Sequence, residues 1–428
     1  MSFERMRGLL LNQAIHGRLV SQEADDGAVK QIGMAPDAEP FTLPKSWRWI
    51  NIKELVIPTK QTIPVENFTY IDVSSIKNFH LEGVKKLEPS NAPSRARKVV
   101  QAGMVLFATV RPYLKNICIA PTLSGNVIAS TAFATMSCSD CLINRYLFYV
   151  LRSDYFTELV KGKQRGISYP AISERDFYAC HIPVPPVKEQ IRIVAKLEEA
   201  FAEINRAEKA YEELQTLAGV LRGQILQEAI QGKLVPQLES EPEVEQISET
   251  PEDVPFTIPL KWKWATIGDS LQYGSSEQVN GQSIPRNAWV LDLEDIEKES
   301  GRLLIKKRNI SNRSNKAKFK KGDVLYGKLR PYLNKCIIAD EAGFSTTEIV
   351  AIRPKEGNYK FDAEYLKAFL MSPFFVNYAN QASYGVKMPR LGTKDAKAAF
   401  IPVPPLAEQC RIVARLNKLL ASINQLGD

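Results

Sequence analysis

The chain has 428 residues, of which 44% are hydrophobic, and a formal net charge of +8. This length suggests two or three globular domains, and the positive charge permits a polyanionic partner without proving one. The six cysteines show no framework spacing, and the sequence contains no signal peptide or long apolar run. We therefore expect a cytoplasmic protein with reduced thiols.

The N-terminal residues 1–22 predict a short amphipathic helix, with apolar side chains such as Met6 and Leu10 at helical spacing. A linker rich in Ala, Asp, Gly and Pro follows. Residues 41–182 then contain alternating runs with β-branched and aromatic side chains, as strands do, and a helical segment at 144–160. We interpret 41–182 as a first domain of the α+β class.

The stretch 183–235 organises the rest of the chain. It opens with a Pro-x-Pro-Pro run that cannot lie inside a helix, whereas Pro186 and Glu189 suit a first helical turn. The residues from 187 to 235 contain no proline, and apolar side chains recur at three- and four-residue steps. This pattern predicts a long, coiled-coil-like helix of ~65 Å at ~1.5 Å per residue.

The remainder of the chain repeats these parts. Residues 236–255 carry many Glu residues and no Lys or Arg, which predicts a solvated linker or, alternatively, a mimic of DNA. Residues 256–401 repeat the first domain, and residues 402–428 repeat the start of the long helix. Residues 6–20 resemble the end of that helix.

The repeats predict a tandem duplication of two α+β domains, joined by long antiparallel coiled-coil-like helices. Because the helix at 402–428 is shorter than its first copy, we expect residues 3–20 to pack beside its end. Such an arrangement would complete the second helical region and restore a pseudo-twofold symmetry.

Several catalytic signatures are missing from the sequence. The three histidines, His16, His80 and His181, do not stand at metal-ligand spacing with one another. The sequence also lacks a phosphate-binding loop and a nucleophile elbow. We therefore expect a non-catalytic chain without a metal ion of its own.

Basic residues concentrate between residues 302 and 330, and a weaker cluster occupies the corresponding part of the first half. Lysines and arginines that approach phosphates displace counterions and supply DNA affinity independent of sequence. The run from Arg111 to Lys115 recurs in the second half from Arg330 to Lys335. A phosphate contact and a structural pairing with a carboxylate are both open for the two arginines.

Two glycine-bearing loops, 162–170 and 382–390, differ more between the halves than the surrounding sequence does. Variable polar and aromatic residues on such loops are candidates for base readout, although an ordinary surface loop is an equal alternative. The predicted DNA-binding residues are Arg111, Lys115, Gln164, Arg165, Ser168, Tyr169, Lys328, Arg330, Lys335, Tyr384, Lys387 and Arg390.

A doubled Pro-x-Pro-Pro-x-x-Glu-Gln-x-x-Ile-Val run, at 183–194 and 402–413, resembles the specificity (S) subunit of type I restriction–modification systems. The Gly-Asp-Val-Leu-Tyr-Gly-Lys-Leu-Arg-Pro run at 322–331 is also similar to that family. The resemblance implies two target-recognition domains that each read one half of a bipartite DNA site. It further implies helices that set the spacer and dock two methyltransferase (M) subunits and, through them, restriction (R) subunits.

The resemblance assigns no cofactor to this chain and places S-adenosylmethionine, ATP and Mg on partner subunits. It also marks the starts of the two docking helices, which contain Glu189, Gln190, Arg192, Glu408, Gln409 and Arg411. Two alternatives stay open: a stand-alone sequence-specific DNA-binding regulator, and a self-sufficient nuclease or methyltransferase with unrecognised motifs.

Overall fold

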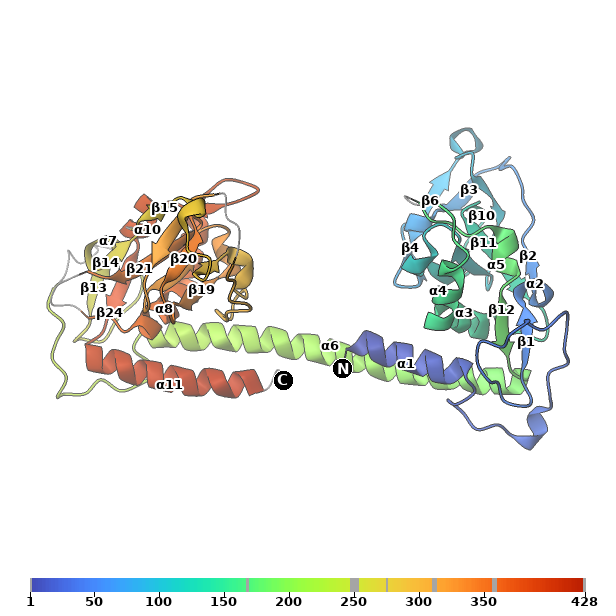
Figure 1. The fold of residues 1–428 in the computed structure, drawn as a ribbon, viewed down its shortest axis with the longest axis horizontal. Coiled ribbons are helices and arrows are strands. Elements are labelled where there is room, and N and C mark those ends of the chain that lie inside the picture. The colour runs from blue at the N-terminus through green and yellow to red at the C-terminus, as the bar shows by residue number, and fades with distance from the viewer. Residues whose placement is uncertain are drawn as a thin grey trace. The chain divides into compact units, whose positions relative to one another are not determined.

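The computed structural model describes residues 2–166, 169–246, 254–274, 276–309, 314–355 and 360–425. The chain divides into two compact units, Met1–Ala210 and Tyr211–Asp428, and the border falls inside the 44-residue helix α6 (Val187–Ile230). Each unit carries its own sheets, helices and apolar core (Figure 1). No described helix is long and apolar enough to cross a membrane.

Unit 1 contains two four-stranded sheets, ordered β6-β3-β10-β7 and β2-β11-β8-β9, and the pairs β1-β12 and β4-β5. β10 runs parallel to β3 and antiparallel to β7. Every residue of β3 and β8 is buried, as suits short runs with β-branched and aromatic side chains. The strands are β1 (Arg48–Asn51), β2 (Val56–Pro58), β3 (Phe68–Ile71), β4 (Ile76–Lys77), β5 (His80–Leu81), β6 (Lys85–Leu87), β7 (Ala96–Val99), β8 (Val105–Ala108), β9 (Ile117–Ile119), β10 (Asn126–Ser130), β11 (Phe133–Cys138) and β12 (His181–Val184).

Helix α3 covers one of these sheets and contacts β8, β9 and β11. Ser153 ends α3 and caps α4, because its hydroxyl accepts a hydrogen bond from the N–H of Phe156 at 3.2 Å. The helices of unit 1, besides the first part of α6, are α1 (Phe3–Ile15), α2 (Ile52–Leu55), α3 (Asn144–Arg152), α4 (Asp154–Lys161) and α5 (Glu174–Tyr178).

Helix α1 runs antiparallel to α6 within unit 1 (Figure 1). Arg7, in its first half, pairs with Glu208, whereas Gln22, beyond its end, donates to Glu189 at 3.4 Å. The helix ends at Ile15 because Gly17 turns the backbone into the left-handed region at φ +67°. The expected packing of residues 3–20 beside the end of the C-terminal helix involves both units and stays a prediction.

Unit 2 repeats the topology of unit 1, which confirms the predicted duplication. The sheet β14-β21-β18-β19 reproduces β2-β11-β8-β9, and the parallel pair β16-β20 reproduces β3-β10. The sheets differ at their edges, because β6 extends one sheet of unit 1 whereas β15 extends the opposite edge in unit 2. The strands are β13 (Lys263–Thr266), β14 (Leu271–Tyr273), β15 (Gln278–Val279), β16 (Trp289–Leu291), β17 (Lys316–Phe319), β18 (Val324–Gly327), β19 (Cys336–Ile338), β20 (Gly343–Thr346), β21 (Ile349–Pro354), β22 (Ser383–Tyr384), β23 (Arg390–Leu391) and β24 (Phe400–Val403).

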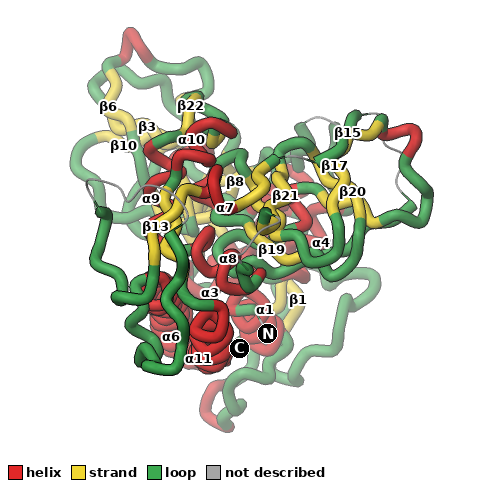
Figure 2. Tube along the Cα trace, turned by 90° about the vertical axis from the view of Figure 1, so that its left-hand side faces the viewer, coloured by secondary structure: helices red, strands yellow, loops and turns green. Residues whose placement is uncertain are grey.

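The second part of α6 and α11 lie side by side and antiparallel in unit 2 (Figure 1, Figure 2). Arg222 on α6 donates to Asn424 near the end of α11 at 2.6 Å. This arrangement matches that of α1 and the first part of α6, so each unit contains one antiparallel helix pair. The helices of unit 2 are α7 (Ile267–Ser270), α8 (Ala363–Met371), α9 (Pro373–Gln381), α10 (Thr393–Ala398) and α11 (Leu406–Gln425).

The acidic segment 236–255 is exposed over most of its described part, as its composition predicts, but Glu241 anchors it to unit 2. The Glu241 side chain is buried, and both its carboxylate oxygens accept from Arg411 at 2.8 and 2.9 Å. Lys261 donates to the backbone carbonyls of Leu238 and Glu239 at 2.8 and 2.7 Å. The sequence does not indicate this anchoring, because the cations that bind the segment are distant in the sequence. Residues 247–253 lie outside the described residues.

Candidate nucleic-acid interface

In unit 1, the repeated Arg-Pro-Tyr-Leu run forms a 3-10 turn at Pro112–Leu114. Left-handed residues flank this turn, with φ of 48° at Arg111 and 51° at Lys115. Such a conformation is unfavourable for residues with a side chain, so other contacts must hold it. The N–H of Arg111 donates to the carbonyl of Pro170 at 2.7 Å, and this bond fixes the turn to the loop at 162–170.

The same construction recurs in unit 2. Pro331–Leu333 forms the turn, and Arg330 and Asn334 flank it with φ of 52° and 48°. The N–H of Arg330 donates to the carbonyl of Pro389 at 2.7 Å, which fixes the turn to the loop at 382–390. Sequence reasoning matched the two runs but could not foresee that each turn is joined to its variable loop.

The loop of unit 1 closes through two backbone hydrogen bonds between Arg165 and Ala171, both 2.9 Å long. Gly166 allows the closure at φ +92°. The Arg165 side chain is 81% exposed, and Tyr169 is 70% exposed. The guanidinium of Arg111 lies over the Tyr169 ring, 4.6 Å from its centroid. Three predicted residues therefore share one surface with a cation and an aromatic ring at its centre.

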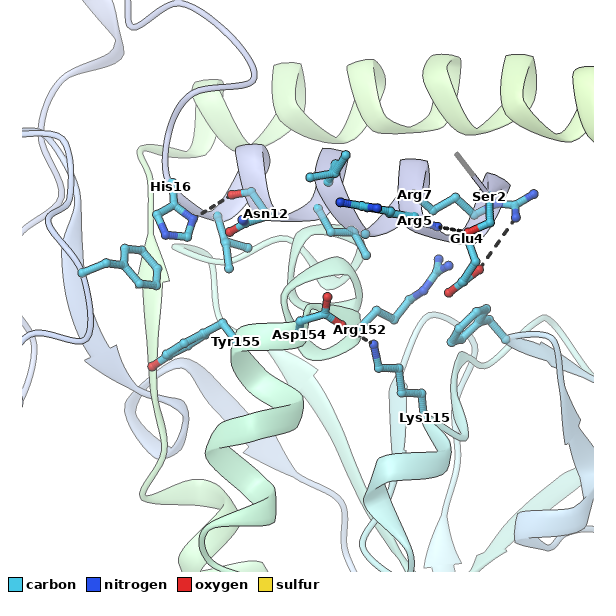
Figure 3. Close-up of a pocket in the computed structure, with 16 residues that line it drawn as sticks. Ser2, Glu4, Arg5, Arg7, Asn12, His16, Lys115, Arg152, Asp154 and Tyr155 are labelled. Atoms are coloured by element: carbon cyan, nitrogen blue, oxygen red, sulfur yellow. Dashed lines mark hydrogen bonds and ion pairs between the residues drawn. The ribbon is translucent and has the colours of Figure 1, made fainter. Parts of the chain in front are cut away.

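The other three predictions in unit 1 have different outcomes. Gln164 is half-buried beside this surface. Ser168 lies outside the described residues. Lys115 is bound by Asp154 at 2.9 Å, beneath α1 (Figure 3), so the structure does not place it with Arg111 and Tyr169.

In unit 2, β22 and β23 form a hairpin with Gly385 at its tip, at φ +94°. Tyr384 is 61% exposed, and Lys387 is exposed as well. Arg390 instead donates through Nε to both carboxylate oxygens of Glu348 at 3.1 Å. Arg390 therefore also holds the base of the hairpin, and its predicted DNA contact stays a prediction.

Lys328 joins this surface because its carbonyl accepts from the N–H of Leu391 at 3.0 Å. Lys335 does not, because its ammonium donates to the carbonyl of Leu293 at 2.7 Å, and burial lowers its pKa. Lys335 thus connects two segments of unit 2, and its predicted DNA contact stays a prediction. The structural counterpart of Lys115 is Asn334.

The surfaces also contain residues that sequence reasoning missed. Tyr113 and Tyr332, in the two repeated turns, are 41% and 49% exposed, and Val386 at the hairpin tip is fully exposed. The repetition of a tyrosine in both turns was the available signal. Exposed apolar and aromatic side chains beside cations are suited to contact nucleic-acid bases as well as phosphates.

Most of the basic cluster between 302 and 330 is already paired with acids distant in the sequence. Lys307 is bound by Glu294 and the buried Asp295, which raise its pKa. Comparable ion pairs join Lys306 to Asp340, Arg308 to Glu341, Lys316 to Asp292 and Lys318 to Glu277. Arg313 lies outside the described residues. The cluster therefore offers less charge to a phosphate backbone than its sequence suggests.

Gln190 and Gln409, at the starts of the two predicted docking helices, are buried and connect each helix start to its own unit. Gln190 accepts from the N–H of Ile143 at 2.8 Å and donates to the carbonyls of Cys141 and Pro185 at 2.9 Å. Gln409 makes the same three contacts in unit 2. The polar atoms of both glutamines are therefore engaged inside the chain, and the docking role of the helices that contain them stays a prediction.

Glu189 and Glu408, which precede these glutamines in the two predicted docking helices, are fully buried. Burial raises the pKa of the Glu189 carboxyl, although Trp47 opposes this effect through a hydrogen bond of 2.9 Å from its indole N–H. Burial likewise raises the pKa of Glu408, and Trp262 lies close enough to lower it in part. These carboxyl groups cannot reach a partner surface without unpacking the helix start.

Arg192 and Arg411 complete the predicted docking set and are held by acids of the preceding segments. Arg192 donates to both oxygens of Asp26 at 2.7 Å, and Arg411 donates to both oxygens of Glu241 at 2.8 and 2.9 Å. Three described carboxylates lie close enough together to hold a metal ion, those of Glu23, Asp25 and Asp26. Arg192 and Lys188 already bind these carboxylates, so the group forms ion pairs in this structure.

A sequence model of the type I restriction modification DNA specificity domain matches residues 272–427 of this chain. The EcoDI specificity subunit of Escherichia coli is 26% identical over 64% of this chain, and the match spans 62% of that protein. The EcoBI specificity subunit is 24% identical over 65% of this chain and is matched over 59% of its length. These matches span less than two thirds of either relative.

Two solved structures are similar over most of the chain. A chain from a structure of the type I R-M system, described for its complex assembly and conformational transition, gives a TM-score of 0.70 at 27% identity. That likeness covers 91% of this chain and 93% of the other. The HsdS subunit from Thermoanaerobacter tengcongensis gives a TM-score of 0.55 at 28% identity, and the likeness covers 90% and 92% of the two chains.

Proposed function

This chain belongs to the family of type I restriction–modification specificity subunits, and on that premise we propose that each unit reads one half of a bipartite DNA site. The observation that carries the proposal is the repeated turn joined to a variable loop. The frame of this surface is common to both units, whereas its exposed residues differ, as with Arg165 in unit 1 and Tyr384 in unit 2. Two different half-sites require such a combination.

Within each surface, Arg111 or Arg330 binds the DNA backbone, and the variable loop contacts base edges. The arginines suit phosphate because they are the same in both units, and a residue that reads bases should differ between different half-sites. Arg165, Tyr169, Tyr384 and Lys387 supply the exposed groups for base contacts.

The helices set the spacer between half-sites and dock two methyltransferase subunits and, through them, restriction subunits. The exposed apolar side chains of Leu214, Leu217 and Val220 on the middle of α6 support a docking role, since such a stripe favours contact with another protein. The chain itself is non-catalytic and acts in the cytoplasm. S-adenosylmethionine, ATP and Mg act on the partner subunits.

The test is to map methylated bases in DNA from cells that carry this chain with its neighbouring methyltransferase. A second strain carries the chain with residues 41–182 exchanged for another reader domain. We expect a split motif in which only one half changes. A continuous motif, or methylation independent of this chain, would contradict the proposal and favour a stand-alone regulator.

A self-sufficient nuclease or methyltransferase is the other alternative, and the family likeness does not support it. Incubation of the pure chain with DNA, magnesium, ATP and S-adenosylmethionine distinguishes the two. The proposal expects neither cleavage nor methyl transfer until the partner subunits are added.

A further inference from the structure

Beneath α1, unit 1 contains a groove of about 630 Å³ that α1, α3 and the start of α4 enclose (Figure 3). Aromatic rings of Phe41, Phe79 and Tyr155 form part of its wall. The charged side chains along the groove are Glu4, Arg5, Arg7, Lys115, Arg152 and Asp154. Cations therefore outnumber acids on its lining.

Most of the buried charge in this groove is already compensated. Arg7 donates to Asn205 at 2.7 Å and is paired with Glu208, and Lys115 is paired with Asp154. Among the partly buried charged residues that line the groove and that the structure describes, Arg152 differs because its charge is not compensated. It makes no hydrogen bond or ion pair with any described residue, and its Nε is inaccessible to solvent.

The surroundings of Arg152 hold its guanidinium in place without neutralising it. The group lies flat over the Phe79 ring, 3.7 Å from the centroid, and also faces Phe148 and Phe201 at 5.0 and 5.5 Å. Burial lowers the pKa of Arg152 to about 10, which still leaves it protonated at neutral pH. One face of the cation is thus covered by aromatic rings, while its N–H groups have no hydrogen-bond partner among the described residues.

The repeated fold does not require a cation at this position. Arg152 is the last residue of α3, and its counterpart at the end of α8 is Met371, which is buried. Both are followed by a serine that caps the next helix. A neutral side chain therefore satisfies the same scaffold in unit 2, so a partly desolvated charge in unit 1 needs a separate explanation.

A guanidinium with a free N–H edge binds a carboxylate through two parallel hydrogen bonds. Glu4 and Asp154 on the lining repel the closely spaced charges of a DNA backbone more than they repel one carboxylate. Leu9, 45% exposed on α1, and the aromatic wall add apolar surface for the rest of a bound segment. The groove thus complements a peptide that is both acidic and apolar.

We propose that this groove docks an amphipathic acidic segment of the methyltransferase subunit, with Arg152 as the anchor for one Asp or Glu side chain. The proposal rests on the proposed function, because it assumes that the chain binds a methyltransferase. It adds that the two units are unequal in docking, since unit 2 has Met371 in place of the anchor.

The test compares Arg152→Met with the wild-type full chain, by isothermal titration with the purified methyltransferase subunit. Methionine suits the position because unit 2 already holds one there, and thermal unfolding checks the fold. We expect the methyltransferase Kd to rise about 30-fold, as for removal of one member of a desolvated charge pair. Arg152→Lys keeps the positive charge but loses the paired N–H donors of the guanidinium, so it should raise the methyltransferase Kd by less.

The matched control is Arg145→Met on the same helix, where the cation is exposed and already paired with Glu198. Its Kd should change by about twofold at most. A Kd for Arg152→Met within about twofold of wild type would overturn the anchor and leave the proposed function intact. Absence of methyltransferase binding by the wild-type chain would overturn both. Loss of DNA binding in Arg152→Met with methyltransferase binding unchanged would assign the groove to DNA phosphate instead.

Discussion

Gln190 distinguishes a structural role from a docking role at the start of the repeated helix. Its amide connects three backbone groups, of Ile143, Cys141 and Pro185, at 2.8 to 2.9 Å. Replacement by methionine preserves the length of the side chain and removes all three hydrogen bonds. The substitution therefore perturbs the connection between α6 and the start of α3 without opening a large cavity.

The expected magnitude follows from those three bonds. Each contributes a net ~1 kcal/mol, and a buried backbone group left without a partner costs a further ~1–3 kcal/mol. We expect the free energy of unfolding of unit 1 to fall by about 3–5 kcal/mol. For a domain of this size, 1 kcal/mol corresponds to ~2–4 °C, so the Tm should fall by roughly 10 °C.

The assay is thermal and urea denaturation of the full chain, with Gln13→Met on the exposed side of α1 as the control. The control should alter the free energy of unfolding by less than ~0.5 kcal/mol. A Gln190→Met chain as stable as the control that no longer binds the methyltransferase would refute the structural reasoning. That result would instead assign Gln190 a direct part in binding the methyltransferase.

Three further changes test separate parts of the structure. One extra helical turn inserted in α6 after Ala210 adds ~6 Å and should lengthen the spacer of the methylated motif by about two base pairs, as read by methylation mapping. Gly385→Ala places a Cβ on a residue with φ +94°, 3.2 Å from the carbonyl oxygen of Met388. The variant should therefore recognise only one of the two half-sites less well. DNA-binding measurements on sites with one half altered at a time check this. Arg192 lowers the pKa of Asp26 from 3.8 to about 2, so this ion pair stabilises the fold above pH ~4 and its contribution is lost toward pH 2. Asp26→Asn should therefore have a lower free energy of unfolding than wild type at neutral pH. In acid denaturation, this difference between variant and wild type should shrink between pH ~4 and pH ~2.

Local patterns carried the predictions that succeeded. The Pro-x-Pro-Pro run and the apolar spacing after it predict a long helix, and α6 spans Val187–Ile230. Helix formation depends on neighbours three and four residues apart, so a single window of sequence contains the required information. The duplication was equally accessible, because two copies of one fold retain similar residues where the frame requires them.

Pairings between distant residues caused the predictions that failed. The basic run at 302–330 looks unopposed in the sequence, but Lys307 is held by Asp295 and Arg308 by Glu341 once the chain folds. Lys335 was grouped with the repeated turn by its position, although its ammonium binds the Leu293 carbonyl. Which charges are compensated depends on tertiary contacts, and a linear pattern contains no measure of them.

The repeated Glu-Gln pair has a structural role that the family resemblance alone does not indicate. The resemblance places Gln190 and Gln409 in the docking helices, and in the structure each glutamine connects a helix start to its own unit. Residues that maintain a frame must stay the same in both units, whereas residues that read different half-sites must differ. By this reasoning, recognition belongs to positions where the copies disagree and the side chain is exposed, such as Arg165 against Tyr384. Arg152 in unit 1 and Met371 in unit 2 also differ at corresponding, less exposed positions, and we interpret this difference as a distinction in what the two units bind.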